Sequence, residues 1–189
     1  GHVLLASLCA YPLAKHSFPG RNLINQLIVY SLMFSTVVTQ IPTYMIVSWL
    51  GLIDTHLAII IPAWGFTLGL FLMRQFMVTI PDELFEAAKI DGANEYQTFF
   101  HIVMPLVKPA WLTSIILLFQ QLWGIDGGSY IFTENLKPLS YALSQIVAGG
   151  VARTGTAAAV TVIMLIVPII VFIINQSKML DTMAHSGLK

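Results

Sequence analysis

The residues of this sequence that could do chemistry are mostly acidic, and they are concentrated in one stretch. Of the nine Asp and Glu residues, five lie between positions 79 and 109, namely Asp82, Glu83, Glu86, Asp91 and Glu95. Long apolar segments precede and follow this stretch. Its carboxylates can offer negative charge to a docking partner, so the stretch is the first candidate for a functional site.

Enzymatic chemistry has no comparable candidate. The sequence contains no GxxxxGK[ST] phosphate-binding loop, which predicts that the chain does not hydrolyse ATP itself. It has no HExxH zinc motif, its five histidines are scattered, and an isolated Asp-x-His pair at 54 and 56 is a poor metal signal. The single cysteine, Cys9, rules out a disulfide within this sequence. We therefore predict no catalytic residue, no metal site and no cofactor.

The acidic stretch has the sequence signals of two short helices joined by a turn. Thr79 can cap the first helix, and Pro81 fits its first turn, where the missing N–H costs nothing. Gly92 can end that helix in the left-handed conformation, and Asn94 can start the second. Pro105 then breaks the regular backbone. We expect these helices to present the carboxylates at the ends of the apolar segments.

The composition predicts that those segments cross a membrane. The chain is 57% hydrophobic and 10% charged, with a mean hydropathy of +0.80. Soluble domains carry about 25% charged residues, so this chain is far too apolar for one. Its formal net charge is zero, which gives no reason to expect a nucleic-acid partner.

The apolar runs predict an all-α, polytopic bundle of transmembrane helices. We expect four complete spans, at 23–41, at 57–73, at 156–175, and one that begins with 109–123. Residues 1–14 are too short for a span and look like the end of a helix that starts earlier. With no initiator methionine, we expect a fragment that lacks its N-terminal helix.

Several residues should interrupt or shape these spans. Pro42 should bend or end the first, leaving 43–51 as a separate apolar piece, and Pro168 should kink the last. Arg74 and Gln75 should end the second span. Gly149-Gly150 should interrupt the helix before the last span. A polar tail is expected from Gln176. Gly65 and Gly69 form a GxxxG pattern, which allows close helix packing but also reflects how common glycine is in membrane helices.

Basic residues predict the orientation of these spans. With four complete spans, one side receives Lys15, Arg21, Arg74, Lys89, Lys108, Lys178 and Lys189, and the other receives Lys137 and Arg153. Lys and Arg accumulate in cytoplasmic loops, so the acidic hairpin should lie in the cytoplasm.

The acidic stretch resembles a known motif. Glu86-Ala87-Ala88, then Asp91-Gly92-Ala93, Phe99, Ile102 and Pro105, is similar to the EAA loop of ABC importer permeases. The resemblance implies a cytoplasmic coupling loop over 79–105 that docks on a separate ATPase through Glu86, Ala87, Ala88, Asp91, Gly92 and Pro105. The alternative is an ordinary amphipathic helical hairpin.

Flanking strings narrow the resemblance to one group of these permeases. YPLAKHSFPGRN at 11–22 and Ile-Pro-x-Tyr at 41–44 resemble the carbohydrate (maltose-type) binding-protein-dependent transport family. At 123–126, Trp-Gly-Ile-Asp matches that family's Trp-Asn-Asp-Phe pattern only in part.

The resemblance implies a type I importer fold, with residues 1–189 as one transmembrane permease domain in the cell membrane. It also implies several partners: ATPase subunits, a second permease subunit in a heterodimer or a homodimer, an extracytoplasmic solute-binding protein and a sugar.

A second set of candidates concerns the solute itself. Gln40, Gln121 and Trp123 could line a translocation path, since amides and an aromatic face suit a sugar. The alternative explanation, which the residue types favour, is helix–helix hydrogen bonding by the glutamines and an interfacial position for the tryptophan. Two other functions stay open: a permease for a peptide, amino acid or phosphate, and an integral membrane enzyme that uses Asp54, His56 or Asp126.

Overall fold

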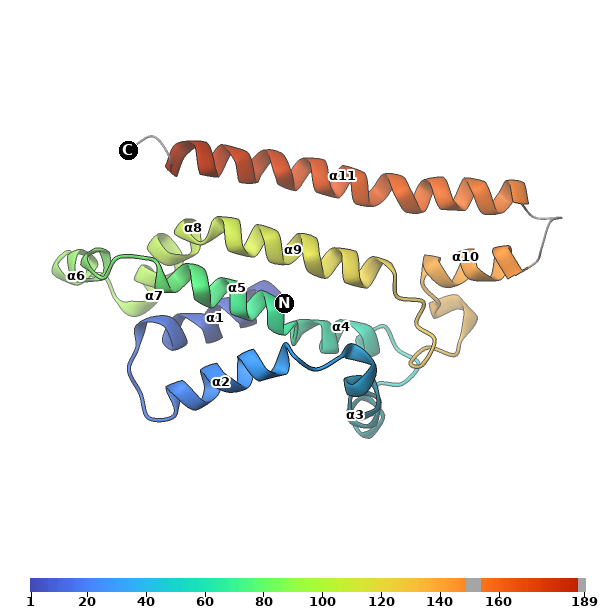
Figure 1. Ribbon diagram of the computed structural model, residues 1–189, viewed down its shortest axis with the longest axis horizontal. Coiled ribbons are helices and arrows are strands. Elements are labelled where there is room, and N and C mark those ends of the chain that lie inside the picture. The colour runs from blue at the N-terminus through green and yellow to red at the C-terminus, as the bar shows by residue number, and fades with distance from the viewer. Residues whose placement is uncertain (149–153, 187–189) are drawn as a thin grey trace. The chain divides into compact units, whose positions relative to one another are not determined.

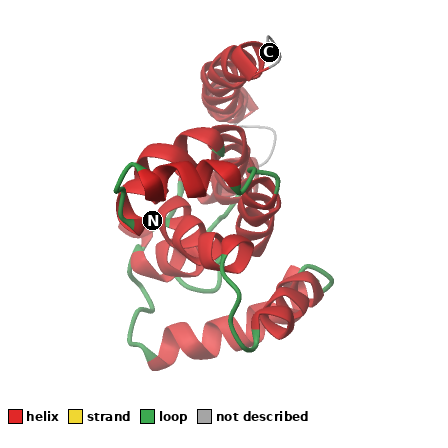
Figure 2. Ribbon diagram, turned by 90° about the vertical axis from the view of Figure 1, so that its left-hand side faces the viewer, coloured by secondary structure: helices red, strands yellow, loops and turns green. Residues whose placement is uncertain are grey.

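The computed structural model describes residues 1–148 and 154–186, and these form helices joined by turns and loops (Figure 1). No strand occurs in the described ranges (Figure 2). The all-α prediction is confirmed. Two compact units are present, one made of Gly1–Ser35, Trp64–Ile115 and Met179–Lys189, the other of Thr36–Ala63 and Ile116–Lys178. We describe each by itself.

The first unit contains the acidic hairpin. Its helices are α1 (His2–Lys15), α2 (Arg21–Ser31), α5 (Thr67–Val78), α6 (Glu83–Ile90), α7 (Glu95–Thr98), the π-helix η1 (Phe99–Val103), α8 (Met104–Leu106) and the start of α9 (Lys108–Trp123). α1 packs along α5, and the second arm of the hairpin closes over both.

The core of this unit is built from small residues facing large ones. Ala10 of α1, Met73 and Met77 of α5, Val103 of η1 and Ala110 of α9 have no exposed surface. Alanine lets the backbone of α1 approach closely, and methionine fills the irregular space opposite. The hairpin is therefore seated on a packed helical base.

The second unit holds α3 (Thr36–Trp49), most of α4 (Leu57–Trp64), the end of α9, the 3-10 turn η2 (Glu134–Leu136), α10 (Leu139–Ala148) and most of α11 (Thr154–Ser186). Its two loops, around Asp54 and around Thr133, are joined by hydrogen bonds. The predicted interruption at Gly149-Gly150 lies outside the described residues.

Two helical stretches among the described residues are long and apolar enough to cross a membrane, Leu57–Val78 and Gly155–Gln176. The number rises to four if two broken helix pairs, Arg21–Ser31 with Thr36–Trp49 and Glu95–Leu106 with Lys108–Trp123, each count as one span. The predicted four spans match this upper count.

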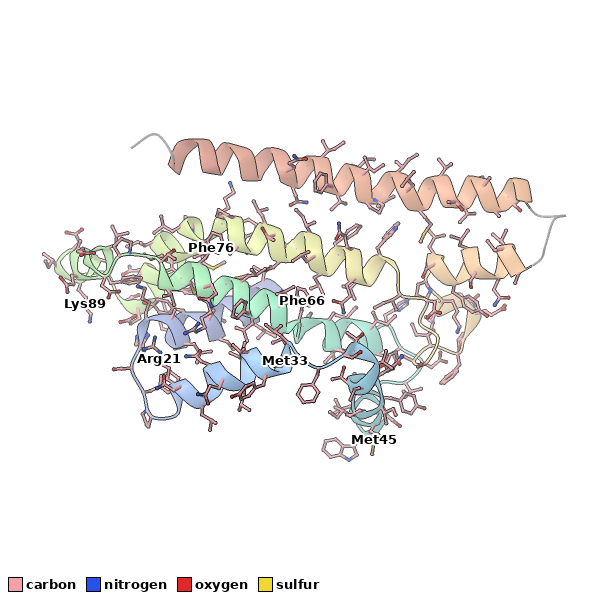
Figure 3. The ribbon with its side chains drawn as sticks, in the orientation of Figure 1. Arg21, Met33, Met45, Phe66, Phe76 and Lys89 are labelled. Carbon is pink, nitrogen blue, oxygen red and sulfur yellow. The ribbon has the colours of Figure 1, made fainter. Side chains whose placement is uncertain are left out.

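The first predicted span is not the single helix 23–41. It breaks at residues 32–35, and Met33 lies in this break (Figure 3). The N–H groups of Leu32 and Met33 donate to carbonyls three residues earlier, those of Val29 and Tyr30. The Ser31 hydroxyl donates to the Ile28 carbonyl at 2.7 Å. These local bonds replace the helical ladder, so α2 ends there.

Pro42, which was predicted to bend or end the helix, does not end it. α3 continues through it to Trp49, so the segment 43–51 is not a separate piece over most of its length. Interior prolines are tolerated in membrane helices because neighbouring groups satisfy the freed backbone. Pro168 likewise lies inside α11, which runs on to Ser186, so the predicted tail is helical that far.

The second predicted span is longer than expected and interrupted. α4 and α5 are separated at Gly65–Phe66, and α5 passes through Arg74 and Gln75 to end at Val78. Gly65 lies in the break, so the two glycines do not share one helix. Gly69 does permit close packing, because a Cβ there would lie 2.1 Å from Nε2 of His2 in α1.

Candidate functional site

The first arm of the hairpin starts later than its sequence suggests. α6 begins at Glu83 with Asp82 before it, and Pro81 precedes the helix. Thr79 does not cap the helix, since its hydroxyl donates to the Phe76 carbonyl at 2.8 Å at the end of α5. Glu83 and Glu86 lie in the first turn of α6, where the helix dipole favours negative charge.

The turn between the arms is formed as predicted. α6 ends at Ile90, and Gly92 has φ of 78°, in the left-handed region that glycine enters without a Cβ clash. Its N–H donates to the Lys89 carbonyl at 3.1 Å. Gly92 thus lets the chain reverse within two residues of the helix end.

The second arm starts with a capping box. The Asn94 side chain accepts a hydrogen bond from the Gln97 N–H at 2.8 Å, and the Gln97 side chain accepts one from the Asn94 N–H at 2.9 Å. This reciprocal pair fixes where α7 begins, which confirms Asn94 as the start.

Pro105 acts differently from the prediction. The regular α-helix is already replaced by π-helix at Phe99–Val103, and the N–H of Met104 donates to the Phe99 carbonyl, five residues back. A proline lacks an N–H and displaces the carbonyl four residues before it, which a π-turn accommodates. The break itself follows at Val107.

The hairpin has one buried and one exposed side. Ala88 is 5% exposed and Phe99 is 3% exposed, so these side chains face the base of the unit. Glu86, Ala87, Asp91, Gly92 and Pro105 are exposed. Five of the six residues expected to contact a partner are therefore accessible, while Ala88 supports the arm from below.

Large apolar side chains accompany the exposed carboxylates. Ile90 is 86% exposed and Tyr96 is 76% exposed, one on each side of the Gly92 turn. Sequence reasoning missed both. The available signal was an isoleucine directly before an Asp-Gly turn, where a polar residue is usual. Exposed apolar side chains rimmed by charge are typical of a protein-binding surface. Figure 3 shows Lys89 projecting from the same helix.

The three path candidates lie in the second unit, and no hydrogen bond or ring contact joins them to one another within the described ranges. Gln40 and Gln121 are exposed. Trp123 stacks on Phe119 with ring centroids 5.4 Å apart, and its Nε1–H donates to the Met164 carbonyl of α11 at 3.0 Å. Trp123 therefore has a helix-packing contact in this structure.

The residues considered for an enzyme have other contacts. Asp54 has φ of 62°, and its carboxylate accepts bonds from the N–H groups of Phe132 at 2.9 Å and Thr133 at 2.8 Å, and from the Thr133 hydroxyl at 2.5 Å. Asp126 accepts from the Gly128 N–H at 2.8 Å. Across the described residues, no three His, Cys, Asp or Glu side chains gather as a metal site would require.

The hydrogen bonds between Asp54 and the loop around Thr133 favour the ionised carboxylate. Hydrogen bonds from the Thr133 hydroxyl and amide, and from the Phe132 amide, hold the pKa of the Asp54 carboxyl below its ordinary value. The ionised form is the one that accepts all three bonds.

A family model described as "Binding-protein-dependent transport system inner membrane component" matches residues 2–181. The chain belongs to this family. Its relatives include Protein LplC of Bacillus subtilis, 38% identical over 139 residues that cover 72% of this chain and 46% of that protein. The polygalacturonan/rhamnogalacturonan transport system permease protein YtcP of the same organism is 34% identical, covering 77% of this chain and 51% of that protein.

A solved structure has the same fold. It comes from a bacterial ABC transporter involved in the import of the acidic polysaccharide alginate, with a TM-score of 0.78 and 26% identity, covering 93% of this chain and 68% of that one. The chain spans about half the length of the two curated relatives named above. Family membership confirms the predicted resemblance and, with the apolar helices, makes the chain a multi-pass membrane component.

Proposed function

We propose that this chain is part of the membrane-spanning permease of an ATP-driven importer for a sugar or oligosaccharide, and that the hairpin 79–105 couples it to a separate ATPase. The observation that carries the proposal is the two-sided hairpin. Its inner face is buried on the unit core, and its tip exposes Ile90 and Tyr96 beside the carboxylates of Glu86 and Asp91. Such a tip offers apolar anchors and charge on a rigid support.

Contacts between loops support a cytoplasmic hairpin. In the first unit, the end of α1 contacts the hairpin through Lys15 and Asp82, and both were assigned to the basic-rich side. In the second unit, Asp54 contacts Thr133, and four alternating spans would put both of these loops on the side opposite the hairpin. Alternating spans require loops of one side to lie together, as these pairs do.

The partners follow from this role. The ATPase supplies nucleotide hydrolysis, because the given sequence has no phosphate-binding loop. A second permease subunit completes the path, and an extracytoplasmic binding protein delivers the solute. Each state of the ATPase favours one arrangement of the permease, so the permease alternates between inward-open and outward-open forms.

The solute class rests on the relatives. One is named for polygalacturonan and rhamnogalacturonan, another for diacetylchitobiose, and the solved neighbour for alginate. We infer a carbohydrate for this chain by analogy with those names. Reconstituted full-length permease, with its ATPase and binding protein, should show ATP hydrolysis stimulated by an oligosaccharide and not by a peptide, an amino acid or phosphate.

We place Gln40, Gln121 and Trp123 along the path as a secondary proposal. Exposed amides can hydrogen-bond sugar hydroxyls, and an indole face suits the apolar face of a sugar ring. Gln40→Leu should lower solute uptake without lowering the amount of protein in the membrane. Unchanged uptake would remove Gln40 from the path.

A further inference from the structure

The last turn of α1 is bonded to both arms of the hairpin. The Tyr11 hydroxyl donates to Oε2 of Glu95 at 2.8 Å, and Nζ of Lys15 donates to Oδ1 of Asp82 at 2.7 Å. Asp82 directly precedes α6, and Glu95 is the first residue of α7. Each arm thus has its own bond to α1. We call these four residues, Tyr11, Lys15, Asp82 and Glu95, the α1 latch.

The latch is embedded in aromatic packing. The Lys15 side chain is only 11% exposed, and its ammonium lies 5.0 Å from the centre of the Phe85 ring while also donating to the Ile80 carbonyl. The Tyr11 ring is buried, with ring centres 6.2 Å from Phe85 and 5.4 Å from Phe99. Packing therefore fixes the orientation of both donors, unlike a pair of mobile surface charges.

The other end of α1 is seated at the break between α4 and α5. Nδ1 of His2 lies 3.0 Å from the Trp64 carbonyl, a hydrogen bond in which the ring N–H donates. The His2 ring also meets Phe66 edge-on at 5.5 Å and occupies the space beside Gly69 that a Cβ would fill. The first residue of α1 is thus tied to the interrupted span. Phe66 is labelled at this break in Figure 3.

Between its two ends, α1 is one rod of 14 residues, about 21 Å long. Ala6, Ala10 and Ala14 bury one side of it in the unit core. Apolar packing of this kind keeps α1 against the core, but it does little to stop α1 from sliding along the core or rotating about its own axis. The directional bonds at the two ends supply that specification.

We propose that α1 is a strut that transmits movement of the hairpin to the break at Gly65–Phe66, with the α1 latch as its gripping end. This rests on the coupling role proposed for the hairpin. Tyr11 and Lys15 are positioning residues: they act by making α1 follow the hairpin as a rigid body. Without the latch, the hairpin still docks on the ATPase, but its displacement is lost before it reaches the span.

The first test measures solute transported per ATP hydrolysed in the full-length permease, reconstituted with its ATPase and binding protein. Tyr11→Phe removes only the hydroxyl, and Lys15→Met removes the charge and the N–H donors of the ammonium while keeping an apolar side chain. Each should lower this ratio several-fold while ATPase binding stays at the wild-type level. Tyr30→Phe, the same change on an exposed residue of α2, is the matched control and should leave the ratio unchanged.

Rescue separates positioning from general stability. Glu95→Gln keeps an oxygen that can accept the Tyr11 hydroxyl, whereas Glu95→Leu does not. Coupling should survive the first change and fall with the second. The double variant of Tyr11→Phe with Glu95→Leu should be no worse than either single variant. Fully additive losses would overturn the pairing.

A distance measurement tests rigid movement directly. Spin labels at Leu8 of α1 and Lys89 of α6, both exposed, should keep one separation in the nucleotide-free and ATP-bound complexes after Cys9 is replaced. In Lys15→Met the separation should change between the two states. A wild-type separation that changes with nucleotide would overturn the strut.

The two proposals fail in different ways. If Gly92→Pro uncouples transport while the Tyr11 and Lys15 variants behave as wild type, the strut is wrong and the coupling role stands. If the ATPase does not bind the hairpin at all, both are wrong.

Discussion

The acidic hairpin and the loop pair around Asp54 are each held by partners that lie 67 to 84 residues apart in sequence, but by different chemistry. The hairpin is held by side chains of one helix, Tyr11 and Lys15, which bond to carboxylates at the start of α6 and α7. The loop pair is held around one residue, Asp54, whose carboxylate accepts two backbone N–H groups and a hydroxyl, and whose own N–H donates to the Tyr130 carbonyl at 2.8 Å.

This difference indicates different tasks. Bonds between side chains on helices join bodies that keep their own internal geometry, so they suit a part that moves as a unit. Bonds from a carboxylate to backbone amides fix the loop conformation itself. We expect the function of the hairpin to be sensitive to substitutions that break its turn or its bonds to α1. The conformation of the Asp54 loop pair should be sensitive to loss of the Asp54 charge.

The largest effect should come from the hairpin turn. Gly92→Pro forces φ away from 78° and removes the N–H that donates to Lys89, at a cost of about 3 kcal/mol or more. That lowers the population of the docking-competent hairpin on the order of a hundredfold, so transport should be lost. Solute uptake and ATP hydrolysis in proteoliposomes measure this.

Gly51→Pro is the matched control for that change. Gly51 has φ of 68°, nothing within 4 Å of an added Cβ, and an N–H that donates to the Ser48 carbonyl at 3.0 Å, as Gly92 donates to Lys89 at 3.1 Å. Both variants suffer the same local damage. Equal loss of coupling in both would show that Gly92 has no special role.

A smaller effect is expected at the hairpin tip. Ile90→Ser exchanges a side chain that is 86% exposed, so the free permease should keep its stability. If Ile90 is an apolar anchor, affinity for the ATPase should fall about tenfold. Titration of purified ATPase onto the detergent-solubilised permease measures it. Wild-type affinity would exclude Ile90 from the interface.

The Asp54 loop pair should respond more mildly. Asp54→Asn keeps an oxygen acceptor and tolerates the left-handed backbone, while Asp54→Ala loses the acceptor and is strained at φ of 62°. Amide hydrogen exchange at Phe132 and Thr133 should accelerate in both, several-fold and more in the alanine variant. Exchange in the hairpin should not change in either.

The smallest effect concerns pH. The pKa of Asp54 is lower in the folded chain, so its stabilisation is fully present above the ordinary aspartate pKa, about 3.9. It is lost as pH falls through the lowered folded value. Protection of the Phe132 and Thr133 amides should therefore decline in that acidic window, relative to neighbouring amides. Asp54→Asn should lack this decline.

Local sequence signals predicted the hairpin well. The Gly92 turn and the Asn94 start depend on residues within four positions of each other, so the sequence contains all of their physics. Thr79 failed as a cap because its hydroxyl found a carbonyl in the preceding helix. Threonine is suited both to capping the helix that follows it and to bonding a carbonyl of the helix before it. The position of the Phe76 carbonyl decides which bond Thr79 makes.

The interruptions of the spans were harder to predict. Proline was the expected cause at position 42, but the break came at 32–35, where backbone N–H groups bond three residues back. No residue type marks that choice. Likewise, nothing near Tyr11 points to Glu95, which lies 84 residues later. Such contacts depend on how helices pack, which residue spacing does not specify.

The most direct test of the coupling role is the side of the membrane on which the hairpin lies. With Cys9 replaced, Ala87→Cys places one thiol on the exposed face of α6. A membrane-impermeant maleimide should label it in inside-out vesicles only, and added ATPase should protect it. Labelling in right-side-out vesicles, or no protection by the ATPase, would contradict the account.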